Sequence, residues 1–226
     1  MSKFISKIIY ISLIFIFTFS ASCFATDSIY VWSSSNNTVT TNANVTDNTT
    51  NTSTNSLNLE SGAAILIDQG TGQILYEHNI HEQLRPASVT KVMSILLIME
   101  AIDSGALSLT DQISCSEHAS SMGGSQIWLD PTETLTVDEM LKAICVVSAN
   151  DCTVAMAEYL AGSEEAFVQM MNTKAKQLGM NDTTFKNCHG IDEDGHVTSA
   201  YDIALMSREL LENHPSITEF TTIWMD

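Results

Sequence analysis

Basic residues are scarce in this chain. Nine Lys and Arg face 27 Asp and Glu among 226 residues, which gives a formal net charge of −18 at pH 7. A nucleic-acid-binding protein needs a basic face to neutralise phosphates, so the sequence excludes nucleic acid from the expected partners. An anionic substrate would need a local cation, because the overall charge repels it.

A zinc-binding cysteine pattern is also missing. The spacing of Cys115, Cys145, Cys152 and Cys188 matches no common metal motif. Cys145 and Cys152 lie in apolar sequence of helical character, so we expect them to be small buried residues. A disulfide among the four stays the less favoured alternative.

The sequence lacks an apolar run long enough for a confident membrane span. Its start instead has the layout of a secretory signal, with two lysines, an apolar segment at 8–19 and a cleavage-like site at 23–25. We therefore expect 1–25 to be a cleaved signal peptide and the mature protein to act outside the cytoplasm. The alternatives are an uncleaved anchor or lipid attachment at Cys23.

Residues 26–60 are rich in Ser, Thr and Asn and hold few apolar side chains. Such a stretch cannot offset the entropy cost of ordering, so we expect a disordered linker. The foldable part is then 61–226, which is about the size of one domain.

The foldable part begins with strands. Two apolar runs, at 63–68 and 74–77, flank a glycine-containing turn and predict a β-hairpin. A hairpin alone is not stable, so we expect the rest of its sheet to come from sequence beyond residue 226. On that expectation the chain by itself would fold poorly and show little activity.

Helices are predicted for most of the remainder. One should run from Ser88 to Gly105, since a proline two residues before its start suits a helix entry. A capping box at 136–139 opens the next helix. Asp151 is expected to cap a third helix. Residues 164–178 are expected to form a fourth, with Phe167, Met170 and Met171 on one face, and a second capping box at 199–202 opens the last.

Ser88 and Lys91 carry the strongest chemical signal. They stand three residues apart at the start of the most apolar predicted helix, so their side chains share nearly one face. Burial there disfavours a charged amine, and the positive end of the helix dipole disfavours it further. A neutral lysine beside a hydroxyl is the chemistry of an activated serine nucleophile. The alternative is a capping serine and a surface lysine.

A polar corner, Ser148-Ala149-Asn150, separates two apolar helical segments sixty residues after Ser88. Buried polar side chains need partners, and a corner that points into a cleft would supply them. Taken alone, the corner is equally consistent with a simple turn between helices.

Together the two motifs resemble those of the penicillin-recognising serine enzymes. The longer segments 85–91, 148–151 and 189–202 are similar to the low-molecular-mass penicillin-binding proteins, which are serine-type D-alanyl-D-alanine carboxypeptidases. The resemblance covers about 61–226. It implies an α/β (α+β) fold of the β-lactamase/transpeptidase type, with an N-terminal hairpin, a helical subdomain and the C-terminal sheet strands missing.

The resemblance also implies roles for single residues. Ser88 would be the acylated nucleophile and one oxyanion donor through its N–H, and Lys91 would accept its proton. Ser148 would pass a proton to the leaving D-alanine, and Asn150 would bond the substrate backbone. The implied substrate is the D-Ala-D-Ala end of peptidoglycan stem peptides, with β-lactams as inhibitors and no metal or cofactor.

The third motif of that family, Lys-Thr-Gly or Lys-Ser-Gly on a sheet strand, is absent, since Lys186-Asn187-Cys188 does not match it. We therefore expect a truncated product, and any membrane association would come from a missing C-terminal segment. Two alternatives stay open, a non-catalytic exported binding fragment and a β-lactamase. The β-lactamase is disfavoured because Glu193 does not fit the Glu-x-x-x-Asn deacylation pattern. His189 and His196 are expected to shape their loop.

Overall fold

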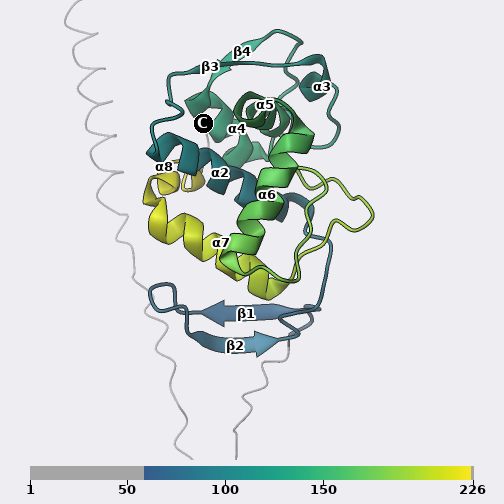
Figure 1. Cartoon of the computed structure of the whole chain (residues 1–226), viewed down its shortest axis with the longest axis vertical. Helices are drawn as coiled ribbons and strands as arrows, with labels where there is room; N and C mark the ends of the chain where they lie inside the picture. Colours follow the sequence, from purple (N-terminus) through teal and green to yellow (C-terminus); the bar gives the residue numbers. More distant parts are fainter. Residues whose placement is uncertain (1–58, 225–226) are drawn as a thin grey trace, which may run out of the picture. The chain divides into compact units, whose positions relative to one another are not determined.

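The computed structural model describes residues 59–224 (Figure 1). The predicted signal peptide and nearly all of the predicted linker lie outside the described residues. Within 59–224, no helix is both long and apolar enough to cross a bilayer.

The predicted hairpin is confirmed. Strands β1 (Ala64–Ile67) and β2 (Ile74–His78) pair antiparallel, with Leu66 opposite Tyr76. Asp68 closes the turn between them, because its carboxylate accepts from the N–H and the hydroxyl of Thr71, at 2.8 and 2.6 Å. Arg208 donates to the carbonyls of Gln69 and Gly70 at 2.6 and 2.8 Å and so ties this turn to a distant helix.

A second, small two-stranded sheet was not predicted. It pairs β3 (Gln112–Ser114) with β4 (Thr134–Thr136). Strands of three residues are too short to leave a clear alternating pattern in a sequence.

Five longer helices form the body of the domain (Figure 1). They are α2 (Lys91–Asp103), α4 (Val137–Val147), α5 (Asn150–Ala161), α6 (Glu164–Leu178) and α7 (Ala200–Asn213). Shorter segments are the 3₁₀ turns η1 (Ala87–Thr90) and η2 (Pro215–Ile217) and the helices α3 (Glu117–Ser120) and α8 (Thr218–Thr221).

Helix α2 is the centre of the core. It packs against α5, α6 and α7, and its buried side chains occupy all of its faces: Met93, Ser94, Ile95, Leu96, Leu97, Ile98 and Met99. A helix that is apolar all round can be stable in water only when other elements surround it. Lys91 lies at its first position and is therefore drawn into the same interior.

Three details differ from the sequence predictions. The α-helix begins at Lys91, and Ser88 lies in the 3₁₀ turn before it. Ala149, not Asp151, is the N-cap of α5. Met170 is exposed, while Phe167 and Met171 are buried. The capping box on Thr136 is confirmed, and the Ser199 side chain caps α7 by accepting from the N–H of Asp202.

The four cysteines of the described region are free thiols. Cys115, Cys152 and Cys188 are buried and Cys145 is half-buried. Burial raises the pKa of the Cys115 and Cys145 thiols to about 11, and it also raises the pKa values of Cys152 and Cys188. The predicted burial of Cys152 is confirmed.

Candidate active site

The structure brings Ser88, Lys91 and Asn150 together. The Lys91 side chain is buried, with 3% of the residue exposed. Its Nζ lies 2.6 Å from Asn150 Oδ1, 2.7 Å from the carbonyl oxygen of His189 and 3.5 Å from Ser88 Oγ. Ser88 itself is exposed, so its hydroxyl faces the lysine from the solvent side.

Burial lowers the pKa of Lys91 from 10.5 to about 8. A neutral amine keeps two N–H donors and one lone pair. The Asn150 and His189 oxygens lie at the shorter distances and match the two donors. The lone pair is then left for the Ser88 hydroxyl, which is the orientation that a proton acceptor requires.

Asn150 joins this cluster to a neighbouring loop. It is 5% exposed, and its Nδ2 donates to the carbonyl of Gly123 at 2.7 Å while its backbone N–H donates to that of Ser125 at 2.7 Å. A side chain at Gly124 would place Cβ 2.9 Å from Asn150 Nδ2. Gly124 is therefore needed for the close approach of this loop to the amide.

A tight backbone contact lies directly before Ser88. Ala87 has a φ of +46°, a left-handed conformation that is strained for a residue with a side chain. Gly190, with a φ of +96°, packs against it so closely that a Cβ would lie 1.9 Å from the Ala87 carbonyl oxygen and 3.0 Å from the Ser88 nitrogen. Only glycine fits there, and the loop that carries it therefore helps to set the position of Ser88.

Ser148 is placed at the corner as predicted, where its backbone N–H donates to the carbonyl of Ala143. It ends α4 in a left-handed conformation with a φ of +59° and is half-buried. Within residues 59–224 its hydroxyl has no hydrogen-bond partner, in contrast to the side chains of Lys91 and Asn150. The hydroxyl is therefore free to rotate towards a bound molecule.

The sequence profile described as D-alanyl-D-alanine carboxypeptidase matches residues 48–225. The chain belongs to this family. The D-alanyl-D-alanine carboxypeptidase DacF of Bacillus subtilis is 54% identical over 173 residues, which cover 76% of this chain and 44% of that relative. The chain thus spans less than half the length of this curated carboxypeptidase.

Solved structures of the carboxypeptidase family have the same fold. The D-alanyl-D-alanine carboxypeptidase DacD from Francisella tularensis is 36% identical with a TM-score of 0.71, over 72% of this chain and 40% of that one. Penicillin-binding protein D2 from Listeria monocytogenes, crystallised in an ampicillin-bound form, is 30% identical with a TM-score of 0.66, over 74% and 68%. The predicted β-lactamase/transpeptidase-like fold is confirmed.

His196 fixes the loop next to the Ser88–Lys91 site. The N–H of Lys186 donates to its Nδ1 at 3.0 Å, so the proton is on Nε2, which donates to the buried hydroxyl of Thr90 at 2.7 Å. Burial lowers the pKa of His196, which agrees with a neutral ring. His189 likewise accepts from the N–H of Ile191 at 3.2 Å. Both contacts agree with the predicted loop-shaping role.

Sequence reasoning missed the role of Asp151. Its carboxylate is fully buried and accepts from the N–H groups of Ile127 and Leu129, both at 3.1 Å. Together with Asn150 it fastens the loop 123–129 to the start of α5. The only sign of this role in the sequence is a carboxylate directly after the Ser-x-Asn motif. A helix cap and a loop anchor give the same sign, so the sequence cannot distinguish them.

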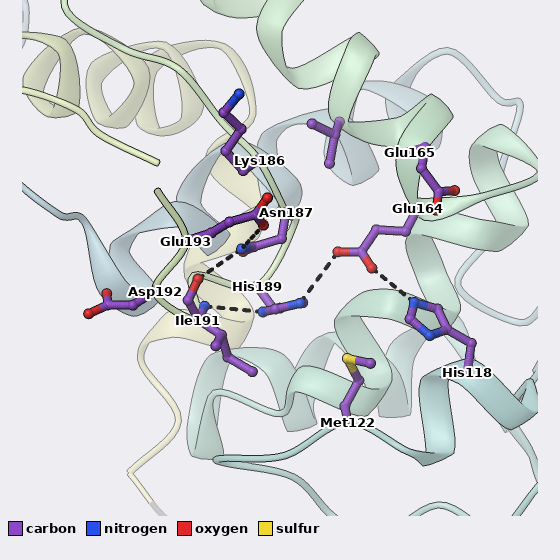
Figure 2. Close-up of a pocket in the computed structure, with 11 residues that line it drawn as sticks. His118, Met122, Glu164, Glu165, Lys186, Asn187, His189, Ile191, Asp192 and Glu193 are labelled. Atoms are coloured by element: carbon purple, nitrogen blue, oxygen red, sulfur yellow. Dashed lines mark hydrogen bonds and ion pairs between the residues drawn. The ribbon is translucent and has the colours of Figure 1, made fainter. Parts of the chain in front are cut away.

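A pocket of about 260 Å³ lies beside the site (Figure 2). Its lining includes His118, Met122, Glu164 and His189. Two of these adjoin the catalytic candidates, because the His189 carbonyl accepts from Lys91 and Met122 precedes the Gly123 carbonyl that accepts from Asn150.

One group in the described region has the ligand spacing of a metal site. Glu100, Glu209 and His214 lie close to one another. Lys174 forms ion pairs with both glutamates, however, and already supplies a cation there. This cluster therefore does not add a metal to the chemistry around Lys91.

Proposed function

We propose that the protein carrying this chain is a serine-type D-alanyl-D-alanine carboxypeptidase, which removes the terminal D-alanine from peptidoglycan stem peptides through an acyl-enzyme on Ser88. One observation carries the proposal. The buried Lys91 amine is held by two oxygens, so that its lone pair is available to the hydroxyl of Ser88. Family membership supports the same reaction class.

In the proposed reaction Lys91 takes the hydroxyl proton, and Ser88 Oγ attacks the carbonyl carbon of the penultimate D-alanine. The N–H of Ser88, in the first turn of η1, donates to the oxyanion that forms. Ser148 then delivers its proton to the nitrogen of the leaving D-alanine as the peptide bond breaks, and takes the proton that Lys91 holds, which returns Lys91 to the neutral amine. In deacylation Lys91 accepts a proton from water, the resulting hydroxide attacks the ester carbon, and Lys91 returns the proton to Ser88 Oγ as the ester bond breaks.

In this proposal Asn150 has few hydrogen-bonding groups left for the substrate. Its oxygen accepts from Lys91 and its Nδ2 donates to Gly123, so one hydrogen of the amide is left for the substrate backbone. Asn150 thus aligns Lys91 and contacts substrate with a single donor.

β-Lactams are proposed to acylate the same serine. A family relative has been crystallised with ampicillin bound, and a β-lactam presents a strained amide where the peptide presents its scissile bond. The test is labelling of the full-length protein by a fluorescent penicillin, with release of D-alanine from a stem pentapeptide measured in parallel.

Wild type should be labelled and should release D-alanine, and Ser88→Ala should do neither. Ser104→Ala is the matched control, because Ser104 lies at the C-terminal end of α2 and its hydroxyl donates to the carbonyl of Ala101, away from Lys91. A folded wild-type protein without label would refute the proposal. Labelling without D-alanine release would favour a binding role, and rapid turnover of nitrocefin would favour a β-lactamase.

Export and domain limits are part of the proposal. Residues 1–25 are proposed to be removed outside the cytoplasm, 26–60 to serve as a linker and 61–226 to belong to the carboxypeptidase domain. Mass spectrometry of the exported protein should find Thr26 as its first residue. Limited proteolysis should cut between 26 and 60 before it cuts the domain.

A further inference from the structure

We infer that Glu164 is a positioning residue for Lys91, acting through the turn at 188–190. The inference rests on the proposed function, since it concerns the base of that reaction. It starts from a single carboxylate that connects the turn at 188–190 to His118 of α3 beside the site (Figure 2).

Glu164 is the first residue of α6 and uses both of its carboxylate oxygens. Oε1 accepts from the N–H of Cys188 at 3.0 Å and lies 3.4 Å from His189 Nε2. Oε2 accepts from His118 Nε2 at 3.0 Å. The turn at 188–190 is thereby fastened to both α6 and α3.

The same turn makes three contacts with the segment that carries the nucleophile and the base. The His189 carbonyl accepts from Lys91 Nζ at 2.7 Å, and the Cys188 carbonyl accepts from Ser94 Oγ at 2.6 Å. Gly190 packs against the backbone of Ala87 and Ser88. A small shift of the turn would therefore move Lys91 and Ser88 relative to each other.

Charge explains why a glutamate suits this place. Burial raises the pKa of Glu164, but the hydrogen bonds from Cys188 and His118 and the charge of His189 when protonated outweigh it, so the pKa is lowered overall. Burial lowers the pKa of His189. Because His189 Nδ1 accepts from Ile191, its neutral ring carries the proton on Nε2 and presents it to Glu164. A carboxylate can accept from all three donors, whereas an amide cannot.

The turn also keeps water from the amine, since Lys91 is 3% exposed beneath it. If the turn loosens, water reaches Nζ and the protonated form is stabilised. The pKa of Lys91 then rises towards its ordinary value, and fewer molecules hold the neutral base at a given pH.

The test compares Glu164→Gln with Glu165→Gln in the full-length protein. Gln keeps the shape of Glu164 but puts an N–H against one of its donors. Glu165 is the matched control, because it is exposed in the same helical turn and points away from His189 in Figure 2. The measurement is the rate constant of acylation by a fluorescent penicillin across the pH range.

At about pH 7 we expect acylation by Glu164→Gln to fall about tenfold or more, as for other small misplacements of catalytic groups. The rising limb of its pH profile should move to higher pH, so that much of the rate returns near about pH 9.5. Glu165→Gln should follow wild type. An unchanged profile for Glu164→Gln, or an equal loss at every pH, would overturn the inference.

A second readout does not depend on activity. In protein labelled with ¹³C at the ε-carbon of lysine, the titration midpoint of Lys91 should be higher in Glu164→Gln than in wild type. If Glu164→Gln does not fold, Glu164→Asp, which keeps the charge and shortens the reach, carries the same comparison. Absence of acylation in wild type would count against the proposed function, whereas an unmoved Lys91 midpoint would count against the positioning role.

Discussion

At the scale of single residues, the protonation state of Lys91 decides the direction of its hydrogen bond with Ser88. As an ammonium, Lys91 has three N–H donors for three oxygens, and Ser88 Oγ must accept. As an amine it has two, and the closer oxygens of Asn150 and His189 take them. Ser88 can then donate, which is the first step of its activation.

The pH dependence of acylation follows from this geometry. In the proposed reaction the active form of Lys91 is the neutral amine, so the rate constant of acylation should rise with pH, about tenfold per unit at low pH, and level off above the Lys91 pKa of about 8. Stopped-flow measurement of penicillin acylation checks this. In Lys91→Arg the guanidinium stays protonated at every pH of the measurement, so the rate constant of acylation should fall at least about a thousandfold. A midpoint near the ordinary lysine value would contradict the lowered pKa.

Gly190 offers a second test at this scale. Gly190→Ala puts a Cβ against the Ala87 carbonyl, so we expect a loss of more than about 3 kcal/mol in the free energy of unfolding and slow labelling of Ser88. Gly179→Ala is the matched control. The φ of Gly179, +76°, is also left-handed, but a Cβ added there would have no atom within 4 Å. This substitution should therefore lower the free energy of unfolding by only about 1 kcal/mol. Equal losses in urea unfolding would contradict the contact.

At the scale of elements, the first turn of α5 acts as an anchor for the loop 123–129. Asn150 holds the loop at Gly123 and Ser125, and Asp151 holds it at Ile127 and Leu129. Between the last two, Trp128 adopts a φ of +59° and remains 76% exposed. The hydrogen bonds of its two neighbours, Ile127 and Leu129, to the buried Asp151 carboxylate keep the backbone of Trp128 in this strained conformation.

Asp151→Ala should therefore release the loop. Loss of hydrogen bonds from a buried carboxylate should lower the free energy of unfolding by about 3 kcal/mol, and the amides of Ile127 and Leu129 should exchange faster with solvent. Asp130→Ala, at the exposed position directly after this loop, should change stability by less than about 0.5 kcal/mol. Unchanged exchange at residues 127 and 129 would show that the loop has other anchors.

The elements that could be predicted from the sequence are those whose contacts join residues close together along the chain. Helix α6 has the predicted bounds, since its pattern repeats along its own sequence. Asp151 was misread because its partners lie over twenty residues away. The Ser88–Lys91 pair was readable from spacing, but the bond of Lys91 to Asn150, 59 residues on, was not. Glu164 resembles any acidic residue at a helix start, so its contacts with Cys188 and His118 left no signal.

At the scale of the whole domain, the hairpin depends on the helices for its position. Strand β1 packs against α7, and Arg208 of α7 bonds two carbonyls of the hairpin turn. A further link pairs Leu84 with Thr198, at 2.8 and 2.9 Å between their backbone N–H and carbonyl groups. The hairpin has few buried side chains of its own, so we expect it to open more readily than α2.

Arg208→Ala should make the hairpin open still more readily than α2. The amides of β1 and β2 should exchange with solvent faster, while those of α2, which lie in the buried core, should keep their protection. Lys142→Ala, which removes an exposed pair with Asp138 on α4, is the control and should leave both unchanged. Faster exchange throughout the domain would indicate that the hairpin and the helices unfold together.

The buried thiols have a practical consequence for work on this protein. The pKa values are raised for all four thiols, those of Cys115, Cys145, Cys152 and Cys188. These thiols should therefore react slowly with maleimides and other alkylating dyes. A cysteine introduced in place of the exposed Trp128 would react first within the described region. A fluorophore attached there would sit on the loop 123–129 and test the proposed binding of β-lactams beside it, without removal of any native sulfur from the domain.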